Sequence, residues 1–245
     1  MTWVKICGMT NLEDALVAVD AGADAVGFVF YEKSPRRVSV ETAREIVERL
    51  PASVEKIGVF VDPYSDPIQV MMDAGLTGTQ SYISVEGVAG SRARTKAIGR
   101  KCLPPGARYL MAFPMTLFGE DVSQVERTVA GFAASRKKLP DGASNTEGLL
   151  DTILLDSGNL RQPGGTGHAF DWTKAIALAE GMRRDGLKLV VAGGLTPETV
   201  GDAIAILKPW GVDVASGVEA RPGKKDPVKV RAFVKAVREM DRKTG

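Results

Sequence analysis

The sequence predicts a single (β/α)8 barrel, the TIM-barrel architecture, on three observations. Eight short apolar runs recur along the whole chain. They are nearly continuous in hydrophobic residues, as expected of parallel strands that are covered on both faces. Segments with helical spacing lie between them, and strands that alternate with helices form right-handed βαβ units. Eight such units close most naturally into a barrel, which we expect to form one domain over residues 1–245.

The expected strands are Val4–Cys7, Ala25–Phe30, Ile57–Val61, Thr79–Ile83, Tyr109–Phe113, Thr152–Asp156, Leu189–Ala192 and Val212–Ser216. The polar segment 137–148, rich in turn-forming residues, precedes the sixth strand and is expected to be a surface insertion. The alternation of strands and helices resumes in phase after it. We therefore expect no domain boundary there.

Capping residues mark the starts of several expected helices, because their side chains can accept hydrogen bonds from the first backbone N–H groups. The helix starts indicated in this way are Thr10 with Glu13, Ser39 before Val40, Thr196 before Pro197, and Asp226 before Pro227.

Composition excludes several classes of protein. The 32 Lys and Arg residues nearly balance the 30 Asp and Glu residues, and the two signs alternate, so the chain has no basic surface typical of nucleic-acid binding. Two cysteines, Cys7 and Cys102, and one histidine, His168, are too few for a structural zinc site or a disulfide framework. We interpret His168 as a bystander. Without a signal peptide or a long apolar run, the chain is expected to be cytoplasmic and free of membranes.

Barrel enzymes carry their chemistry at the C-terminal ends of the strands. Cys7 ends the first expected strand and is either a functional thiol or a small buried core residue. Asp156 ends the sixth and is either a general acid, favoured by partial desolvation, or a cap for the following loop. Arg36 and Arg37, in the loop after the second strand, suit a carboxylate or phosphate, or else are solvated.

Three glycine-rich turns are candidates for phosphate binding through backbone N–H groups, with plain tight turns as the alternative. Gly193-Gly194 and Ser216-Gly217 directly follow the last two expected strands, which is where barrel enzymes commonly bind phosphate. The third turn spans Gly164–Gly167.

Several of these residues lie in motifs that resemble those of the phosphoribosylanthranilate isomerase family. The resemblance is ordered and runs from residue 4 to about residue 235. The motifs that carry it are Val4–Thr10, Ala21–Phe30, Lys33–Arg36, Leu154–Ser157, Gly164–Gly167 with Phe170–Trp172, and Val214–Glu219 with Pro222–Asp226.

The resemblance implies an Amadori rearrangement in tryptophan biosynthesis, without cofactor or metal. The substrate would be N-(5-phosphoribosyl)anthranilate and the product 1-(2-carboxyphenylamino)-1-deoxyribulose 5-phosphate. Cys7 would then be the general base, Asp156 the general acid, and Arg36 the residue that holds the anthranilate carboxylate. The residues implied in phosphate binding are Gly193, Gly194, Ser216 and Gly217, with Gly165 in a nearby turn.

The loop after the fourth strand departs from the family pattern. The family usually has Gln-Leu-His-Gly there, whereas this chain has Gln80-Ser81-Tyr82-Ile83. Gln80 is kept and is expected to bind substrate, but the histidine is absent. The resemblance therefore leaves open what else this loop contributes.

The implied roles require unusual protonation states. Reference pKa values of about 3.9 for aspartate and about 8.5 for cysteine would leave Asp156 ionised and Cys7 protonated. We therefore expect desolvation to raise the pKa of Asp156, and positive surroundings such as Arg36 or the bound iminium to favour the Cys7 thiolate.

Other functions fit the sequence less well. A metal-dependent ribulose-phosphate epimerase needs several histidine ligands, and an indole-glycerol-phosphate synthase would require lysine at the strand ends. A phosphoribosyl-binding protein that has lost catalysis is the alternative from another class. The expected partner is a small phosphoribosyl substrate, and the protein is expected to be a monomer or a homodimer.

Overall fold

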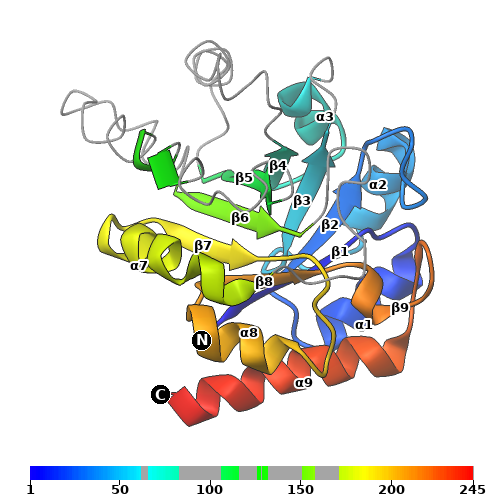
Figure 1. Cartoon of the computed structure of the whole chain (residues 1–245). Coiled ribbons are helices and arrows are strands. Elements are labelled where there is room, and N and C mark those ends of the chain that lie inside the picture. Colours follow the sequence, from blue (N-terminus) through cyan, green and yellow to red (C-terminus); the bar gives the residue numbers. More distant parts are fainter. Residues whose placement is uncertain are drawn as a thin grey trace.

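The computed structural model describes residues 1–61, 66–82, 106–115, 126–127, 129–131, 151–157 and 171–244. Eight parallel strands close into a barrel in chain order, with β8 pairing back onto β1 (Figure 1). The strands are β1 (Trp3–Cys7), β2 (Ala25–Val29), β3 (Glu55–Phe60), β4 (Gly78–Tyr82), β5 (Arg108–Pro114), β6 (Thr152–Asp156), β7 (Lys188–Val191) and β8 (Gly211–Val214). The predicted barrel is confirmed, with strand ends shifted by at most two residues among those described. Ile83 and the segment 137–148 lie outside the described residues.

Alternation along the strands separates two layers of packing. On β1, the side chains of Val4 and Ile6 join the core between the strands and the helices. Trp3 and Cys7 belong to apolar clusters inside the barrel, and Lys5 contacts residues of β4 and β8 there. Both faces of the strand are therefore buried, which explains the nearly continuous apolar runs.

Aromatic and charged residues close the N-terminal end of the barrel. Trp3 stacks on Trp210 with ring centroids 5.1 Å apart, and the guanidinium of Arg108 lies 4.9 Å from the centroid of Trp210. Arg108 also forms a two-point ion pair with Glu55. These contacts seal the end of the barrel opposite the expected site, where barrels commonly place residues for stability.

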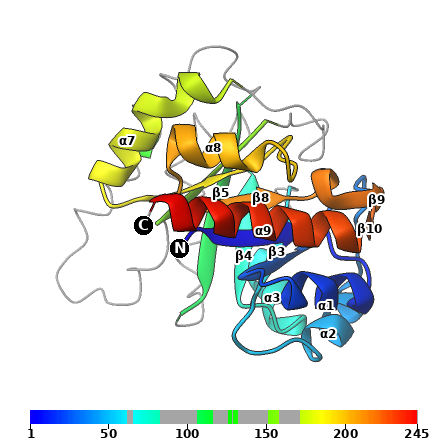
Figure 2. The same ribbon diagram turned by 90° about the horizontal axis from the view of Figure 1, so that it is seen from below.

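The described helices are α1 (Leu12–Asp20), α2 (Val40–Val47), α3 (Pro67–Asp73), α7 (Ile176–Arg184), α8 (Val200–Leu207) and α9 (Pro227–Thr244), with the 3-10 helices η2 (Trp172–Ala175) and η3 (Ser216–Val218). The long helix α9 lies between α1 and α8 and covers β1 (Figure 2). The backbone N–H of Thr2 donates to Asp241 at 2.9 Å, which holds the two termini side by side. In the described part of the chain, no helix is long and apolar enough to span a bilayer.

Two of the predicted helix starts are confirmed and two are wrong. Ser39 caps α2, and Asp226 accepts hydrogen bonds from the first turn of α9. Helix α1 is capped by Asn11, because the hydroxyl of Thr10 instead donates to the carbonyl of Gly223. Helix α8 begins only at Val200, since the residues from Thr196 onward form a separate hydrogen-bonded turn before it.

Candidate active site

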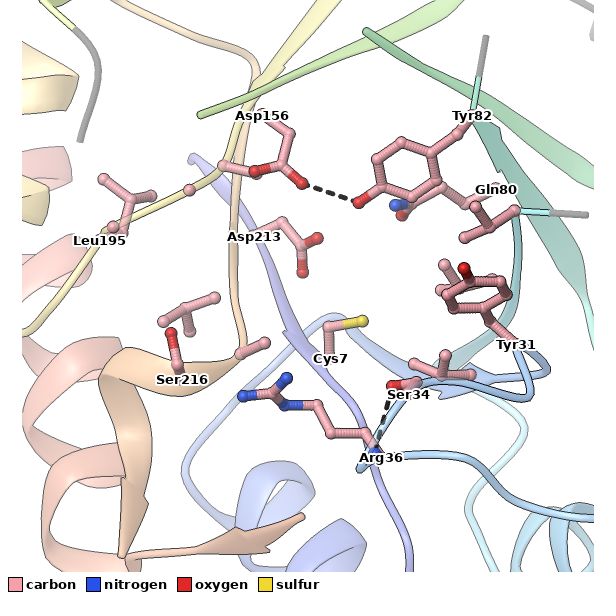
Figure 3. Close-up of a pocket in the computed structure, with 18 residues that line it drawn as sticks. Cys7, Tyr31, Ser34, Arg36, Gln80, Tyr82, Asp156, Leu195, Asp213 and Ser216 are labelled. Atoms are coloured by element: carbon pink, nitrogen blue, oxygen red, sulfur yellow. Dashed lines mark hydrogen bonds between the residues drawn. The ribbon is translucent and has the colours of Figure 1, made fainter. Parts of the chain in front are cut away.

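A pocket lies at the C-terminal ends of the strands, as predicted (Figure 3). The predicted site residues that line it are Cys7, Arg36, Gln80, Asp156, Gly193, Gly194 and Ser216. Gly217 is not among the lining residues. Gly165 and His168 lie outside the described residues. Tyr31, Ser34, Tyr82 and Asp213 also line the pocket and were not predicted.

Cys7 ends β1 at the floor of the pocket and is 8% exposed. A Cβ on Gly27, in the neighbouring strand β2, would lie 2.8 Å from the Cys7 sulfur, so the glycine makes room for the thiol. Burial raises the pKa of this thiol and outweighs the opposing effects of the Lys5 and Lys225 charges. Nearby positive charges thus favour the thiolate as expected, but the expected net direction is wrong because burial outweighs them, and the effect of a bound iminium stays a prediction.

The sequence analysis did not predict the charged network that lies beneath Cys7. Lys5 is fully buried, and its ammonium donates to Asp213 at 2.9 Å and to Gln80 at 3.1 Å. Burial acts to lower the pKa of Lys5, but the charge of Asp213 opposes it and the net direction is upward. Within the described residues, Oδ1 of Asp213 is buried without a hydrogen-bond partner. The positions of Lys5 and Asp213 within otherwise apolar strands could have indicated this network.

Asp156 ends β6 across the pocket from Cys7 (Figure 3). The hydroxyl of Tyr82, at the end of β4, donates a hydrogen bond of 2.7 Å to its Oδ2. Burial, followed by the nearby Asp156 charge, raises the pKa of Tyr82 well above its ordinary value. Tyr82 is therefore a neutral donor at the pH of most enzyme reactions.

Arg36 is positioned by a buried carboxylate. Its Nε and Nη2 donate to the two carboxylate oxygens of Glu219 at 2.9 and 2.8 Å. Burial acts to lower the pKa of Arg36, but the hydrogen bonds with Glu219 outweigh it and raise the pKa. Glu219 also accepts from the ammonium of Lys225 at 3.0 Å, and that ammonium donates to the Cys7 carbonyl at 2.6 Å. One network thus connects the arginine with the strand end that carries the thiol.

The guanidinium keeps a second edge for a ligand. Glu219 occupies the edge formed by Nε and Nη2. A guanidinium has five N–H donors, so Nη1 and the second N–H of Nη2 form another fork that matches a carboxylate. Arg36 can therefore bind an anionic group while Glu219 holds it in place.

The two glycine turns meet behind the rim of the pocket. Gly193 and Gly194 have φ values of +81° and +68°, which glycine adopts most readily. A Cβ on Gly217 would overlap the carbonyl oxygen of Leu195, so the two turns pack backbone against backbone. Gly193, Gly194 and Ser216 thereby present mostly main chain to the pocket, a surface that suits phosphate. In the described ranges, no cluster of His, Cys, Asp and Glu could hold a metal ion.

Known proteins resemble this chain over nearly its full length. The family model described as N-(5'phosphoribosyl)anthranilate (PRA) isomerase matches residues 4–80 and 123–236. The N-(5'-phosphoribosyl)anthranilate isomerase of Chlorobaculum parvum is 38% identical over 243 residues, which cover 99% of this chain and 97% of the relative.

Solved structures also match this chain over nearly its full length. The phosphoribosyl anthranilate isomerase of Thermotoga maritima matches with a TM-score of 0.73 and 35% identity, over 98% of this chain and 100% of that one. A further structure is described as phosphoribosyl anthranilate isomerase in complex with reduced 1-(o-carboxyphenylamino)-1-deoxyribulose 5-phosphate. It matches with a TM-score of 0.68 and 34% identity, over 98% and 100% of the two chains.

Proposed function

The chain belongs to the N-(5'-phosphoribosyl)anthranilate isomerase family, and on that premise we propose that Cys7 and Asp156 catalyse its Amadori rearrangement. The substrate is N-(5-phosphoribosyl)anthranilate and the product is 1-(2-carboxyphenylamino)-1-deoxyribulose 5-phosphate. The observation that carries this assignment is the position of Cys7 and Asp156 on facing sides of one pocket (Figure 3), which Arg36, Gly193, Gly194 and Ser216 also line.

Asp156 starts the reaction as a general acid. It donates a proton to the ring oxygen of the ribose, the bond between C1 and that oxygen breaks, and the substrate nitrogen becomes an iminium. This step requires the protonated carboxylic acid. The expected upward shift of the Asp156 pKa stays a prediction.

Cys7 completes the proton transfer as a general base. The iminium makes the hydrogen on C2 acidic, and the thiolate removes it, so that C1 and C2 become joined by a double bond and the nitrogen becomes neutral. The resulting enol then gains a proton at C1 and loses its hydroxyl proton at C2, which leaves a ketone. Because burial raises the pKa of Cys7, the positive charge of the bound iminium has to favour the thiolate.

Arg36 and the glycine turns bind the two anionic ends of the substrate in this proposal. The second edge of the Arg36 guanidinium holds the anthranilate carboxylate, while the backbone of Gly193, Gly194 and Ser216 holds the phosphate. The resemblance to the family also implies Gly217 and Gly165 in phosphate binding. Asp213 also lines the pocket, and its carboxylate suits a hydrogen bond from a sugar hydroxyl. Gln80 lies beside it, joined through Lys5.

The rearrangement needs no external oxidant or reductant, because C2 is oxidised to a ketone while C1 is reduced. We therefore propose that catalysis requires no redox cofactor. Because Asp156 and Cys7 supply the proton transfers, we also propose that it requires no metal. Activity should be unchanged after treatment with EDTA and gel filtration. A loss of activity that added divalent metal restores would contradict this part of the proposal.

A fluorescence assay tests the function as a whole. The purified protein is mixed with N-(5-phosphoribosyl)anthranilate, and turnover is followed by the change in fluorescence of the anthranilate group. We expect turnover. Binding of a reduced product analogue without turnover would instead favour a phosphoribosyl-binding protein that has lost catalysis.

A further inference from the structure

Tyr82 ends β4, and its side chain lines the pocket. Its phenol donates a hydrogen bond of 2.7 Å to Asp156 (Figure 3). Strand β5 separates the strands that carry the two residues. The contact therefore joins two strands that are not neighbours in the barrel, and no local turn accounts for it.

We propose that Tyr82 is a positioning residue for the general acid and holds the Asp156 carboxyl toward the pocket. The inference rests on the proposed function, since it assigns a task to the residue that contacts Asp156. A hydroxyl donates one proton in a narrow range of angles, so its contact with Oδ2 selects one orientation of the carboxyl group. Asp156 is 2% exposed, so this orientation is set inside the protein.

The chemical state of the phenol suits this task. Because the pKa of Tyr82 is raised well above its ordinary value, the hydroxyl keeps its proton while Asp156 cycles between acid and carboxylate. It can therefore donate to Oδ2 in both states. A donor also stabilises the ionised carboxylate more than the neutral acid, so Tyr82 influences the pH at which Asp156 loses its proton.

Other ionisable groups face the same pocket. Cys7 projects from β1, Asp213 from β8, and Tyr31 and Arg36 from the loop after β2, with Lys5 beneath them. All of these groups are unchanged by Tyr82→Phe, which removes one hydroxyl and keeps the ring. The lost hydroxyl is the one hydrogen-bonded to Asp156, so we expect Tyr82→Phe to shift the pH dependence through this contact.

The experiment measures kcat/KM against pH for wild type and Tyr82→Phe. On the acidic limb Asp156 is protonated in both proteins, and kcat/KM should fall roughly tenfold in the variant, a loss of the size expected for a hydrogen bond to an ionisable group. The midpoint that reports the ionisation of Asp156 should also move up by about 1 pH unit, because the ionised carboxylate has lost a hydrogen-bond donor. The matched control is Tyr109→Phe. It removes a hydroxyl near the N-terminal end of β5, away from the strand ends that form the pocket, and should change neither quantity.

Site-specific replacement of Tyr82 by 3-fluorotyrosine tests the opposite direction. Fluorine makes the phenol a stronger donor, so the same midpoint should move to lower pH. An unmoved midpoint in both Tyr82 variants would overturn the inference, as would a kcat/KM in Tyr82→Phe equal to wild type on the acidic limb. An inactive wild type, or a fully active Asp156→Asn, would contradict the proposed function itself. Either result can be told apart from one that contradicts only the inference about Tyr82.

Discussion

The guanidinium of Arg36 and the carboxylate of Glu219 lie side by side in a two-point ion pair, although the residues are 183 positions apart in the chain. Glu219 begins β9 (Glu219–Arg221), which pairs with β10 (Lys224–Lys225), just after the last barrel strand. Closing the barrel therefore also orients the arginine in the loop after β2. The buried ammonium of Lys225 pairs with Glu219 and thereby helps to hold the carboxylate that orients Arg36.

Glu219→Gln should weaken substrate binding. Glutamine replaces one of the two acceptor oxygens by an NH2 donor, so it cannot match the two N–H donors of the guanidinium. Arg36 then loses its fixed orientation, and KM should rise roughly tenfold or more, with a smaller change in kcat. Steady-state kinetics measure the change. The control is Glu55→Gln, which removes the same kind of ion pair with Arg108 at the opposite end of the barrel and should leave KM unaltered. Equal effects of the two variants on KM would contradict a positioning role for Glu219.

The stability of the fold should depend on Glu219 at acidic pH. Burial acts to raise the pKa of Glu219, but the hydrogen bond from Arg36 and the charges of Lys225 and Arg36 outweigh it and lower the pKa. A lowered pKa in the folded state contributes stability that is present above about pH 4.3, the ordinary value, and is lost as pH falls through the folded value.

Unfolding in urea tests this linkage. At neutral pH, Glu219→Gln should reduce the free energy of unfolding by about 3 kcal/mol, because it leaves Lys225 buried without its partner. The difference between wild type and variant should shrink as pH falls below about 4. A difference that stays constant or grows over this range would show that Glu219 is not ionised in the folded protein.

The thiol of Cys7 should react slowly at neutral pH. Since burial raises its pKa, alkylation by iodoacetamide should reach half its maximal rate above about pH 8.5, the ordinary value for a thiol. The measurement is the modified fraction of the peptide that contains Cys7, determined by mass spectrometry. The same cysteine in urea-unfolded protein is the reference. A folded protein that alkylates fully at a lower pH than the unfolded chain would contradict the account of this site.

Gly193 should not tolerate a side chain. A Cβ at this position would lie 2.7 Å from Asp156 Oδ1 and would overlap Ser157, in a backbone conformation with φ +81°. Gly193→Ala should therefore lower kcat/KM by at least about 100-fold through displacement of the general acid, and should cost about 2 kcal/mol or more of stability.

Gly186→Ala is the matched control for Gly193→Ala. It places a Cβ at φ +72° with open space around it, so only the backbone strain remains. This variant should keep the activity of the wild type. Similar losses of activity in the two variants would show that strain alone, and not the contact with Asp156, explains the effect.

The sequence was sufficient for the barrel because each strand carries its own local signal. Apolar runs bounded by caps and turns marked all eight strands, and Cys7 and Asp156 were found because each ends such a run. That residues 1–245 form one domain stays a prediction. The cap at Thr10 was wrong because a contact with Gly223, at the other end of the chain, took its hydroxyl.

The network around the site could not be predicted in the same way. Lys5 and Asp213 face each other only because β1 and β8 pair when the barrel closes, with these two residues in register. Tyr82 was visible only as a departure from the family pattern, and nothing local indicates that its hydroxyl reaches Asp156. The net pKa of Cys7 was likewise unpredictable, since it depends on burial by several distant strands outweighing two buried lysines.

The central claim is that Cys7 and Asp156 divide the proton transfers between them, and kinetics of Cys7→Ser and Asp156→Asn test it most directly. Both substitutions keep the size of the side chain while removing the acid or base. In the fluorescence assay, wild type should convert N-(5-phosphoribosyl)anthranilate, and each variant should lose at least about 100-fold in kcat, as is typical of a missing general acid or base. Activity within a few fold of wild type in both variants would contradict the assignment.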